Sequence, residues 1–258
     1  MMTAQRREEL KRYLLEYKSA SVEDMARKFE VSGQTIRRDF EVLEKDGFLI
    51  RSHGGAMVKD RKTDFVPNQV RSELLVDAKQ IICQQAVEHI YPNDCIFMDH
   101  STTALTLCQA ISHLPLTVVT NSHRVVERLA DSQTIRLIAT GGVYHRDQEG
   151  YFGSETVKFL QQHCVDKAFL SCRSLDLQRG VSDSDETIAD VRQKVIENAD
   201  SVYLLADHSK FGKSGFVTIC DPSEVDYVIT DRPLDEDWTQ LFQEKGVQVL
   251  DGTAQELQ

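Results

Sequence analysis

The stretch VSGQTIRRDFEVLEKDG, Val31 to Gly47, decides the first recognisable element of the fold. Ile36, Phe40 and Leu43 recur at i, i+4 and i+7, the spacing of one apolar helix face. Ser32 precedes this face as a candidate N-cap, and Gly47 follows it as a candidate C-cap. The pattern therefore predicts an amphipathic helix between these two residues.

The outward face of this helix carries side chains that can read DNA. Gln and Arg each form bidentate hydrogen bonds with base edges, and a recognition helix presents its N-terminal residues to the major groove. The DNA contacts predicted on this helix are Ser32, Gln34, Thr35, Arg37 and Arg38. An ordinary surface helix with solvated arginines is the alternative, because short basic amphipathic helices are common.

The flanking segments predict a winged helix-turn-helix over residues 1–58. Helical patterns near 4–17 and 21–30 precede the recognition helix, and Ser21 and Asp24 have the spacing of a capping box. Two short strands, 48–52 and 56–58, surround Gly54–Gly55 as a hairpin. In this wing we expect Arg51 and His53 to contact the sugar–phosphate backbone. For His53, an exposed turn residue is an equal alternative.

Charge divides the chain in the same place. Residues 1–62 carry 14 Lys+Arg against 11 Asp+Glu, net +3, whereas the remainder carries 16 against 30, net −14. A basic end on an acidic body fits a nucleic-acid partner at that end, although the excess is small. Residues 59–70 are polar, aperiodic and contain Pro67, so they are the predicted linker to a domain over 71–258.

The second domain begins with a helical pattern over 71–91. From residue 94 onward it alternates short apolar runs with amphipathic stretches. Such alternation predicts parallel strands with crossover helices, an α/β sheet. The predicted strands are 95–99, 116–121, 135–140, 167–172, 201–207 and 226–231, and the predicted helices are 103–112, 124–130, 155–162 and 189–199.

Ligands of such sheets bind at the carboxyl ends of the strands. Asp99–Thr103 (DHSTT) follows the first strand and opens a helix, where backbone N–H groups and hydroxyls suit a phosphate. Helix capping is the alternative there. Further strand ends supply Thr120–Asn121, Gly141–Gly142, Ser171–Cys172 and Asp207, and Lys210 adds a cation that could equally be a solvated loop lysine.

The N-terminal stretch TIRRDFEVLEKDGFLIRSHGGA resembles the signature of the DeoR family of bacterial transcription regulators. The family pattern is approximately V-S-x-x-T-[IV]-R-R-D-L-x-x-L-x-x-x-G-x-[IL]-x-R-x-H-G-G-A, and Phe40 stands in place of the usual Leu. The matching positions are Val31, Ser32, Thr35 to Asp39, Leu43, Gly47, Arg51 and His53 to Ala56.

The resemblance continues through the second domain, since DeoR-type sensor domains are similar to the ribose-5-phosphate isomerase and glucosamine-6-phosphate deaminase fold. It implies a phosphorylated sugar as effector. The implied effector-binding residues are Asp99, Thr102, Thr103, Thr120, Asn121, Gly141, Gly142, Glu186 and Lys210. Ser101 is added to this set because its hydroxyl could bind the anion. The segment Asp207, Ser209, Phe211 and Gly212 also matches. The chain departs from the family at Ser101, where Gly is usual, and at 171–176 (SCRSLD), which normally ends G-I-D.

Several classes of protein are disfavoured. The N-terminus has no apolar segment of a signal peptide, and no apolar run of about 18 residues is present. The six cysteines and eight histidines show no metal-binding spacing, so we expect reduced thiols, no metal, no cofactor and a cytoplasmic protein.

The sequence predicts a transcription regulator and not an enzyme. By family analogy it is a repressor of a carbohydrate-utilisation operon, a homo-oligomer (dimer or tetramer) whose operator binding a sugar phosphate modulates. The alternative is a sugar-phosphate isomerase or deaminase fused to a winged helix, in which Asp99, Glu186 and Lys210 supply the acid–base groups. No paired-carboxylate segment such as D-G-A-D-E supports that alternative.

Overall fold

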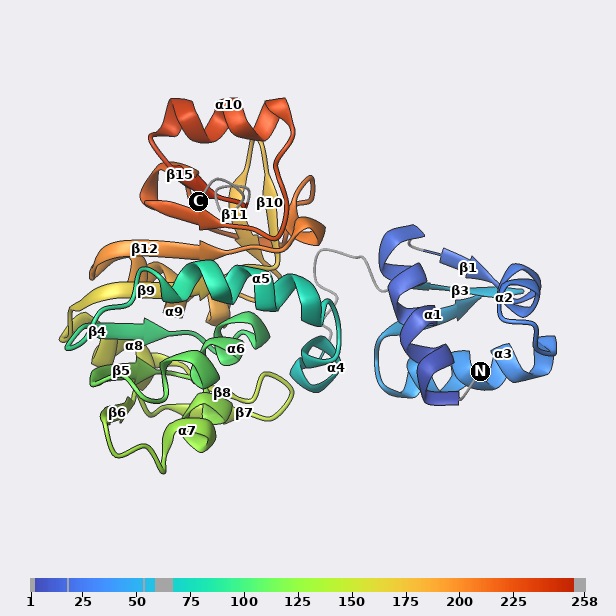
Figure 1. Ribbon diagram of the computed structural model, residues 1–258, viewed down its shortest axis with the longest axis horizontal. Coiled ribbons are helices and arrows are strands. Elements are labelled where there is room, and N and C mark those ends of the chain that lie inside the picture. The colour runs from blue at the N-terminus through green and yellow to red at the C-terminus, as the bar shows by residue number, and fades with distance from the viewer. Residues whose placement is uncertain (1–2, 18, 53, 59–66, 253–258) are drawn as a thin grey trace. The chain divides into compact units, whose positions relative to one another are not determined.

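The computed structural model describes residues 3–17, 19–52, 54–58 and 67–252 (Figure 1). Its contacts divide the chain into two units, Met1–Leu75 and Val76–Gln258. The division lies after the boundary predicted between residues 70 and 71, because Leu74 packs in the N-terminal core and Lys11 Nζ lies 2.6 Å from Glu73 Oε2. His53 and most of the predicted linker lie outside the described residues.

The N-terminal unit is a winged helix-turn-helix, as predicted. Its elements are α1 (Thr3–Tyr17), β1 (Ser19–Ser21), α2 (Val22–Lys28), α3 (Gly33–Lys45), β2 (Leu49–Ser52), β3 (Gly55–Val58) and α4 (Asn68–Ser72). The first three strands form one sheet in the order β1-β3-β2. Ser19–Ala20, expected only as a break between helices, belongs to β1, because Ser19 pairs with Met57 and Ala20 with Ala56.

Local capping sets the ends of the helices around the turn. The Ser21 hydroxyl accepts from Asp24 N at 3.0 Å, and the Ser32 hydroxyl accepts from Thr35 N at 3.2 Å. Asp46 is the C-cap of α3, and Gly47 follows it at φ +76°, a conformation that favours glycine. Both predicted N-caps are confirmed.

The helix predicted over 71–91 is wrong at its start. The chain forms the short α4, then a break, then α5 (Val76–Val87). Leu75 has φ +51°, which no residue inside a right-handed helix adopts. Leu74 turns into the N-terminal core at this break, so the packing of a neighbouring element overrides the helical spacing.

The second unit is built on a seven-stranded parallel sheet, which confirms the α/β prediction. Strand order is β15-β14-β12-β9-β4-β5-β6. The strands are β4 (Cys95–Met98), β5 (Leu116–Thr120), β6 (Ile135–Ala139), β9 (Val165–Ser171), β12 (Ala199–Leu205), β14 (Tyr227–Ile229) and β15 (Gln248–Leu250). Its helices are α5, α6 (Thr102–Ile111), α7 (His123–Leu129), α8 (Ser154–Gln161), α9 (Glu186–Glu197) and α10 (Glu236–Lys245). Short 3₁₀ turns at His208–Lys210 and Pro222–Glu224 complete it.

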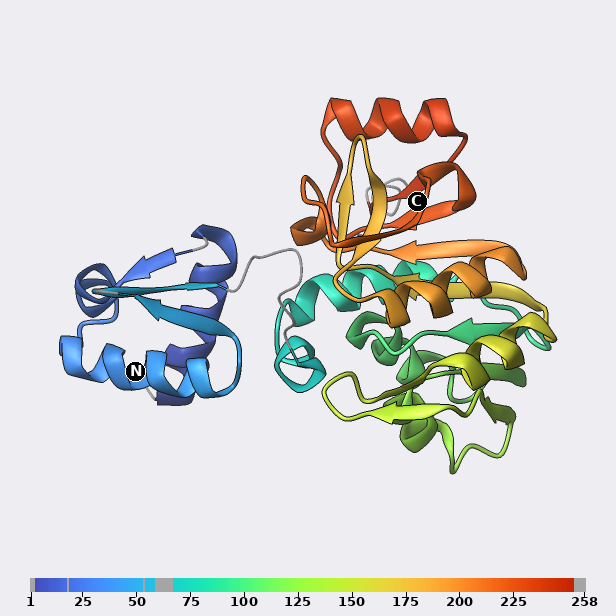
Figure 2. The same ribbon diagram turned by 180° about the vertical axis from the view of Figure 1, so that it is seen from behind.

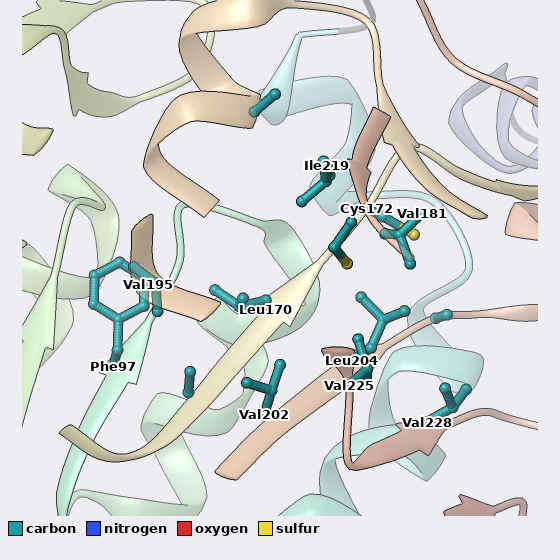
Figure 3. Packing of buried hydrophobic residues seen from close by; sticks show 14 of the residues in the cluster. Phe97, Leu170, Cys172, Val181, Val195, Val202, Leu204, Ile219, Val225 and Val228 are labelled. Carbon is teal, nitrogen blue, oxygen red and sulfur yellow. The ribbon is translucent and has the colours of Figure 1, made fainter. Parts of the chain in front are cut away.

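Helices cover both faces of this sheet. One buried cluster joins α5, α6 and α7 to the sheet through residues such as Ile82, Leu107 and Val125, on the face seen in Figure 1. The other joins α8, α9 and α10, with α9 in front when seen from behind in Figure 2. Phe97, Leu170 and Val202 point into this second cluster (Figure 3). Burial on both faces explains why the strands are continuous apolar runs.

Two small antiparallel sheets complete the unit and were not predicted. One is the hairpin of β7 (Val143–His145) and β8 (Gly150–Phe152). The other, here called the small sheet, joins β10 (Ser174–Asp176), β11 (Gly180–Asp183) and β13 (Val217–Cys220). Their strands are three or four residues long, too short for an alternating pattern to identify.

The order of the large sheet reverses beside β4. From β4 the chain runs outward through β5 and β6, then returns to place β9 on the other side of β4. Ligands of open parallel sheets bind at the carboxyl ends of strands at such a reversal. The ends of β4 and β9 are therefore where a ligand site is expected. Within the described chain, no helix is long and apolar enough to cross a membrane.

Candidate nucleic-acid interface and ligand site

The recognition helix α3 leaves its predicted base-reading side chains exposed. Gln34, Arg37 and Arg38 are exposed, and none of them has a hydrogen bond or ion pair within the described chain. Thr35 is half-buried, and its hydroxyl lies 2.9 Å from that of Ser32. Two unpaired guanidinium groups on an exposed helix face are available to a phosphate or a base edge.

A buried ion pair fixes the opposite face of α3. Asp39 is 1% exposed and accepts from Arg6 Nε at 2.7 Å and from Arg7 Nε at 2.8 Å. These contacts join α3 to α1 across 33 and 32 residues. The sequence placed Asp39 in the family signature but gave it no role, because its partners lie on another helix.

The wing residue Arg51 is not free. Its Nη1 lies 3.0 Å from Glu41 Oε1, and its Nε lies 2.7 Å from Glu44 Oε2. Its backbone N also donates to Glu44 at 3.1 Å. The hydrogen bond to Glu44 and both carboxylates raise the pKa of Arg51, so the side chain stays charged while paired. A DNA phosphate has to compete with α3 for this guanidinium.

At the carboxyl ends of β4 and β5 the structure brings most predicted ligand residues together. Those at most 9% exposed are Asp99, Ser101, Thr102, Thr103, Thr120 and Asn121. The Thr120 hydroxyl donates to Met98 O at 2.6 Å and accepts from Ser122 N at 3.0 Å, which ties the two strand ends. Asn121 Nδ2 donates to Tyr151 O at 3.1 Å, whereas its buried Oδ1 has no hydrogen-bond partner among the described residues. Hydrogen bonds to the main chain therefore hold Thr120 and Asn121 in place at this edge of the sheet.

Ser101 fits where the family usually has glycine because its φ is −69°, an ordinary value for any residue. Its hydroxyl accepts from Ala104 N at 3.0 Å and so caps α6. One N–H of the first helical turn is therefore already used. The remaining N–H groups of that turn and the helix dipole still favour an anion.

Asp99 is wholly occupied by internal partners. Its Oδ1 accepts from Ser101 N at 2.9 Å, and its Oδ2 accepts from Ser171 N at 3.1 Å and from two nitrogens of Arg192. Burial alone would raise the pKa of this carboxyl, but the Arg192 guanidinium and the hydrogen bonds outweigh it and lower the pKa. Asp99 is thus an ionised residue inside the protein.

Arg192, which was not predicted from the sequence, lies at the centre of a buried cluster with Asp99 and Asp183. It is 3% exposed, and it also pairs with Asp183. Burial lowers its pKa, but Asp99 and Asp183 raise it above the ordinary value. The spacing Ile188, Val191, Arg192, Val195 places an arginine on the apolar face of α9, and that position was the signal for a buried ion pair.

Within the described chain, the remaining predicted residues make no hydrogen bond to Asp99, Asp183 or Arg192. Lys210 is half-buried in the 3₁₀ turn after β12, and its ammonium has no hydrogen bond or ion pair within the described chain. Gly141 and Gly142 are exposed after β6, and a Cβ on Gly142 would lie 2.1 Å from the Thr156 hydroxyl. Glu186 is exposed at the start of α9, and within the described chain no hydrogen bond joins it to the cluster.

The thiol of Cys172 adjoins the cluster but is unreactive. It is 3% exposed, and burial raises its pKa to about 12. A thiol with such a pKa remains protonated near neutral pH. In the part of the chain that the structure describes, no group of three His, Cys, Asp or Glu residues could hold a metal ion.

The two units together have the organisation of a DNA-binding transcription regulator with a separate sensor domain. Residues 6–62 match the model of the DeoR-like helix-turn-helix domain, and residues 75–232 match that of the DeoR C-terminal sensor domain. The chain belongs to the DeoR family of transcription regulators, as its N-terminal signature indicates.

Relatives of known name cover most of the chain. The HTH-type transcriptional regulator YulB of Bacillus subtilis is 33% identical over 96% of both chains. The L-fucose operon activator of Haemophilus influenzae is 33% identical over 83% of this chain and 86% of its own. The glycerol-3-phosphate regulon repressor of Escherichia coli is 31% identical over 83% of this chain and 84% of its own.

Among solved structures, ribose 5-phosphate isomerase A of Methanocaldococcus jannaschii is similar with a TM-score of 0.39 and 16% identity. The similarity covers 53% of this chain and 54% of that one.

Proposed function

We propose that this protein represses a carbohydrate-utilisation operon and that a phosphorylated sugar modulates its operator binding. The main support for operator binding comes from Arg37 and Arg38 on the capped helix α3. Both side chains are exposed, and neither has a hydrogen bond or ion pair within the described chain. The named relatives include a glycerol-3-phosphate regulon repressor and an L-fucose operon activator, which supports a carbohydrate-linked target.

On DNA, residues 1–58 bind and the N-terminal half of α3 enters the major groove. Gln34, Arg37 and Arg38 read base edges, while Ser32 and Thr35 lie near the backbone at the helix start. Arg51 of the wing contacts the phosphates, and the sequence assigns the same role to His53. Arg51 must give up its bonds to Glu41 and Glu44 before it can bind a phosphate. It therefore contributes less to DNA affinity than a free arginine would.

In the sensor domain, residues 71–258, the effector phosphate binds at the first turn of α6 beside Ser101, Thr102 and Thr103. Lys210 supplies the unpaired cation. Thr120, Asn121, Gly141, Gly142 and Glu186 line the sugar side. The paired Asp99 shapes this site and does not touch the ligand, because Ser101, Ser171 and Arg192 already occupy its oxygens.

The sensor domains of two or four chains associate and set the spacing of paired recognition helices on an operator. A ligand that lowers DNA affinity must itself bind the DNA-bound form more weakly by the same factor. A coupling of about 1–3 kcal/mol changes either affinity roughly 5- to 150-fold. The protein acts in the cytoplasm, where its DNA is.

The site binds without turnover. Proton transfer beside a sugar carbonyl needs a carboxylate that is free to accept a proton. That carboxylate must also be held in position and have an acid partner. Asp99 is paired with Arg192, and within the described chain no hydrogen bond or ion pair holds the exposed Glu186 carboxylate in place. An assay of turnover on ribose 5-phosphate and glucosamine 6-phosphate tests this point, and conversion of either would favour an enzyme.

Fluorescence anisotropy at fixed salt tests the whole proposal. The protein is titrated onto its own upstream DNA and onto a random duplex of equal length, with and without sugar phosphates and their unphosphorylated parents. Selective binding that one phosphorylated sugar shifts is the expected result. Binding that no sugar changes contradicts the effector half, and equal binding to both duplexes contradicts the DNA half.

A further inference from the structure

One buried arginine joins the large sheet of the sensor unit to the small sheet. Arg192 on α9 donates from Nη2 and Nε to Asp99 Oδ2 at 2.8 and 3.1 Å, and from Nη1 to Asp183 Oδ2. Asp99 follows β4 of the large sheet, and Asp183 ends β11 of the small sheet. A guanidinium can hold two carboxylates in fixed directions, because its donors form a rigid planar fork.

On the large-sheet side, Arg192 acts on the start of α6 through Asp99. The second oxygen of Asp99 accepts from Ser101 N at 2.9 Å. The Ser101 hydroxyl in turn accepts from Ala104 N at 3.0 Å. The direction of the Asp99 carboxylate therefore sets the position of the first turn of α6, where the phosphate is proposed to bind.

On the small-sheet side, Asp183 packs against the segment that follows Lys210. Gly215 N donates to the Ser182 hydroxyl at 2.7 Å, and a Cβ on Gly215 would lie 2.4 Å from Asp183 O. Lys213 N donates to Leu175 O at 3.0 Å, and Phe211 bridges to the same residue of β10. The segment 211–215 is thus held by the small sheet.

Arg192 itself is not available as a phosphate ligand. Each of its three nitrogens already donates to a carboxylate, and the side chain is 3% exposed. The cluster of Asp99, Asp183 and Arg192 carries a formal charge of −1, and the Arg192 guanidinium is the positive charge shared by its two carboxylates. Lys210 remains a cation with no hydrogen bond or ion pair among the described residues.

We propose that Arg192 is a positioning residue, which through Asp99 and Asp183 sets the place of the Lys210 segment relative to the first turn of α6. The spacing between these two groups then decides how well a phosphorylated sugar fits. The inference rests on the effector half of the proposed function.

The variant Asp183→Asn tests this inference with little risk to folding. The amide keeps the size of the side chain, and the remaining Asp99–Arg192 ion pair is electrically neutral. The sugar phosphate concentration that gives half the anisotropy change should rise roughly tenfold or more, the loss expected for a charged hydrogen bond. Operator affinity without ligand should stay within about twofold. Asp176→Asn in the same small sheet is the matched control, since among the described residues the Asp176 carboxylate accepts only from Gln178 N and Arg179 N.

Arg192→Lys is the second variant, because lysine keeps the positive charge but lacks the planar set of guanidinium donors. The sugar phosphate concentration that gives half the anisotropy change should rise in this variant as well. The probes are ribose 5-phosphate, glucosamine 6-phosphate and glycerol 3-phosphate, used well below the unfolding temperature of each variant. A normal response of Asp183→Asn overturns the inference, as does an equal loss of ligand-free operator binding, which marks a merely structural role. No response of the unsubstituted protein to any probe is a different result, since it overturns the effector half of the proposed function itself.

Discussion

The Glu44 carboxylate accepts hydrogen bonds from both the backbone N and the Nε of Arg51, at 3.1 and 2.7 Å. The wing strand β2 is therefore tied to the recognition helix α3 by one side chain. Glu41 adds a second acceptor at 3.0 Å. The family signature marks Arg51 as a DNA contact, but the tertiary structure gives it two internal partners.

Replacing Glu44 should make Arg51 easier for a DNA phosphate to bind, because of its two carboxylate partners only Glu41 would remain. In Glu44→Gln we expect tighter binding to a random duplex and a salt dependence of log Kd against log salt that is steeper by about one, the value for one added phosphate contact. Anisotropy titrations at four salt concentrations measure this slope.

Two controls separate the release of Arg51 from the loss of a negative charge. Glu155→Gln removes a carboxylate that pairs with Lys158 on α8 and should leave the slope unchanged. The double variant with Arg51→Ala should return the slope to its original value. A slope that stays steep in the double variant would show that Arg51 is not responsible.

Arg38→Ala should weaken operator binding by about 1–3 kcal/mol if Arg38 reads a base, with a smaller effect on random DNA. Its guanidinium is exposed and has no partner within the described chain, so its removal leaves no buried charge behind. Arg136→Ala, an exposed arginine of β6, is the control. Equal losses on operator and random DNA would assign Arg38 to the phosphate backbone.

Asp39→Ala should destabilise the N-terminal unit by roughly 3 kcal/mol, because it leaves Arg6 buried without its carboxylate. Trp238, the single tryptophan, lies in α10 and reports only on the sensor unit. Urea unfolding should therefore show an earlier transition by circular dichroism and an unchanged transition by tryptophan fluorescence. Coincident, unshifted transitions would contradict a stabilising role of this ion pair.

Lys210→Ala should leave operator binding intact and remove the response to a sugar phosphate, since the variant loses the unpaired cation of the proposed site. Lys245→Ala is the matched control, because Lys245 pairs with Asp221 on the surface of the same unit. The anisotropy assay measures both properties in one titration series. An unaltered response of Lys210→Ala would exclude this lysine from the site.

The sequence was most informative where its signals are local. Ser32, the apolar stripe of Ile36, Phe40 and Leu43, and Gly47 lie within one stretch of 17 residues, and α3 forms where they indicate. The large sheet was predicted for a related reason: strands buried on both faces must be continuously apolar. The β10, β11 and β13 strands escaped prediction because each is only three or four residues long.

The candidate ligand site was also predicted only in part, where local sequence signals were enough. Thr120 and Asn121 lie beside Asp99–Thr103, as the rule that parallel strands end at one edge predicts. The sequence did not show that Asp99 is buried, nor that Arg192 is its partner. These two residues are 93 positions apart, and only the pairing of β4 with β9 and the packing of α9 bring them together.

By itself the sequence determined the helix-turn-helix, the alternating α/β pattern and the polar strand ends, because caps, periodicity and apolar runs depend on neighbouring residues. Only the tertiary structure decided which charges are free. Arg37, Arg38 and Lys210 have no partners within the described chain, whereas Arg51, Asp39, Asp99 and Arg192 are paired. A charge that folding removes from water needs an opposite charge nearby, and that partner can come from any distance along the chain.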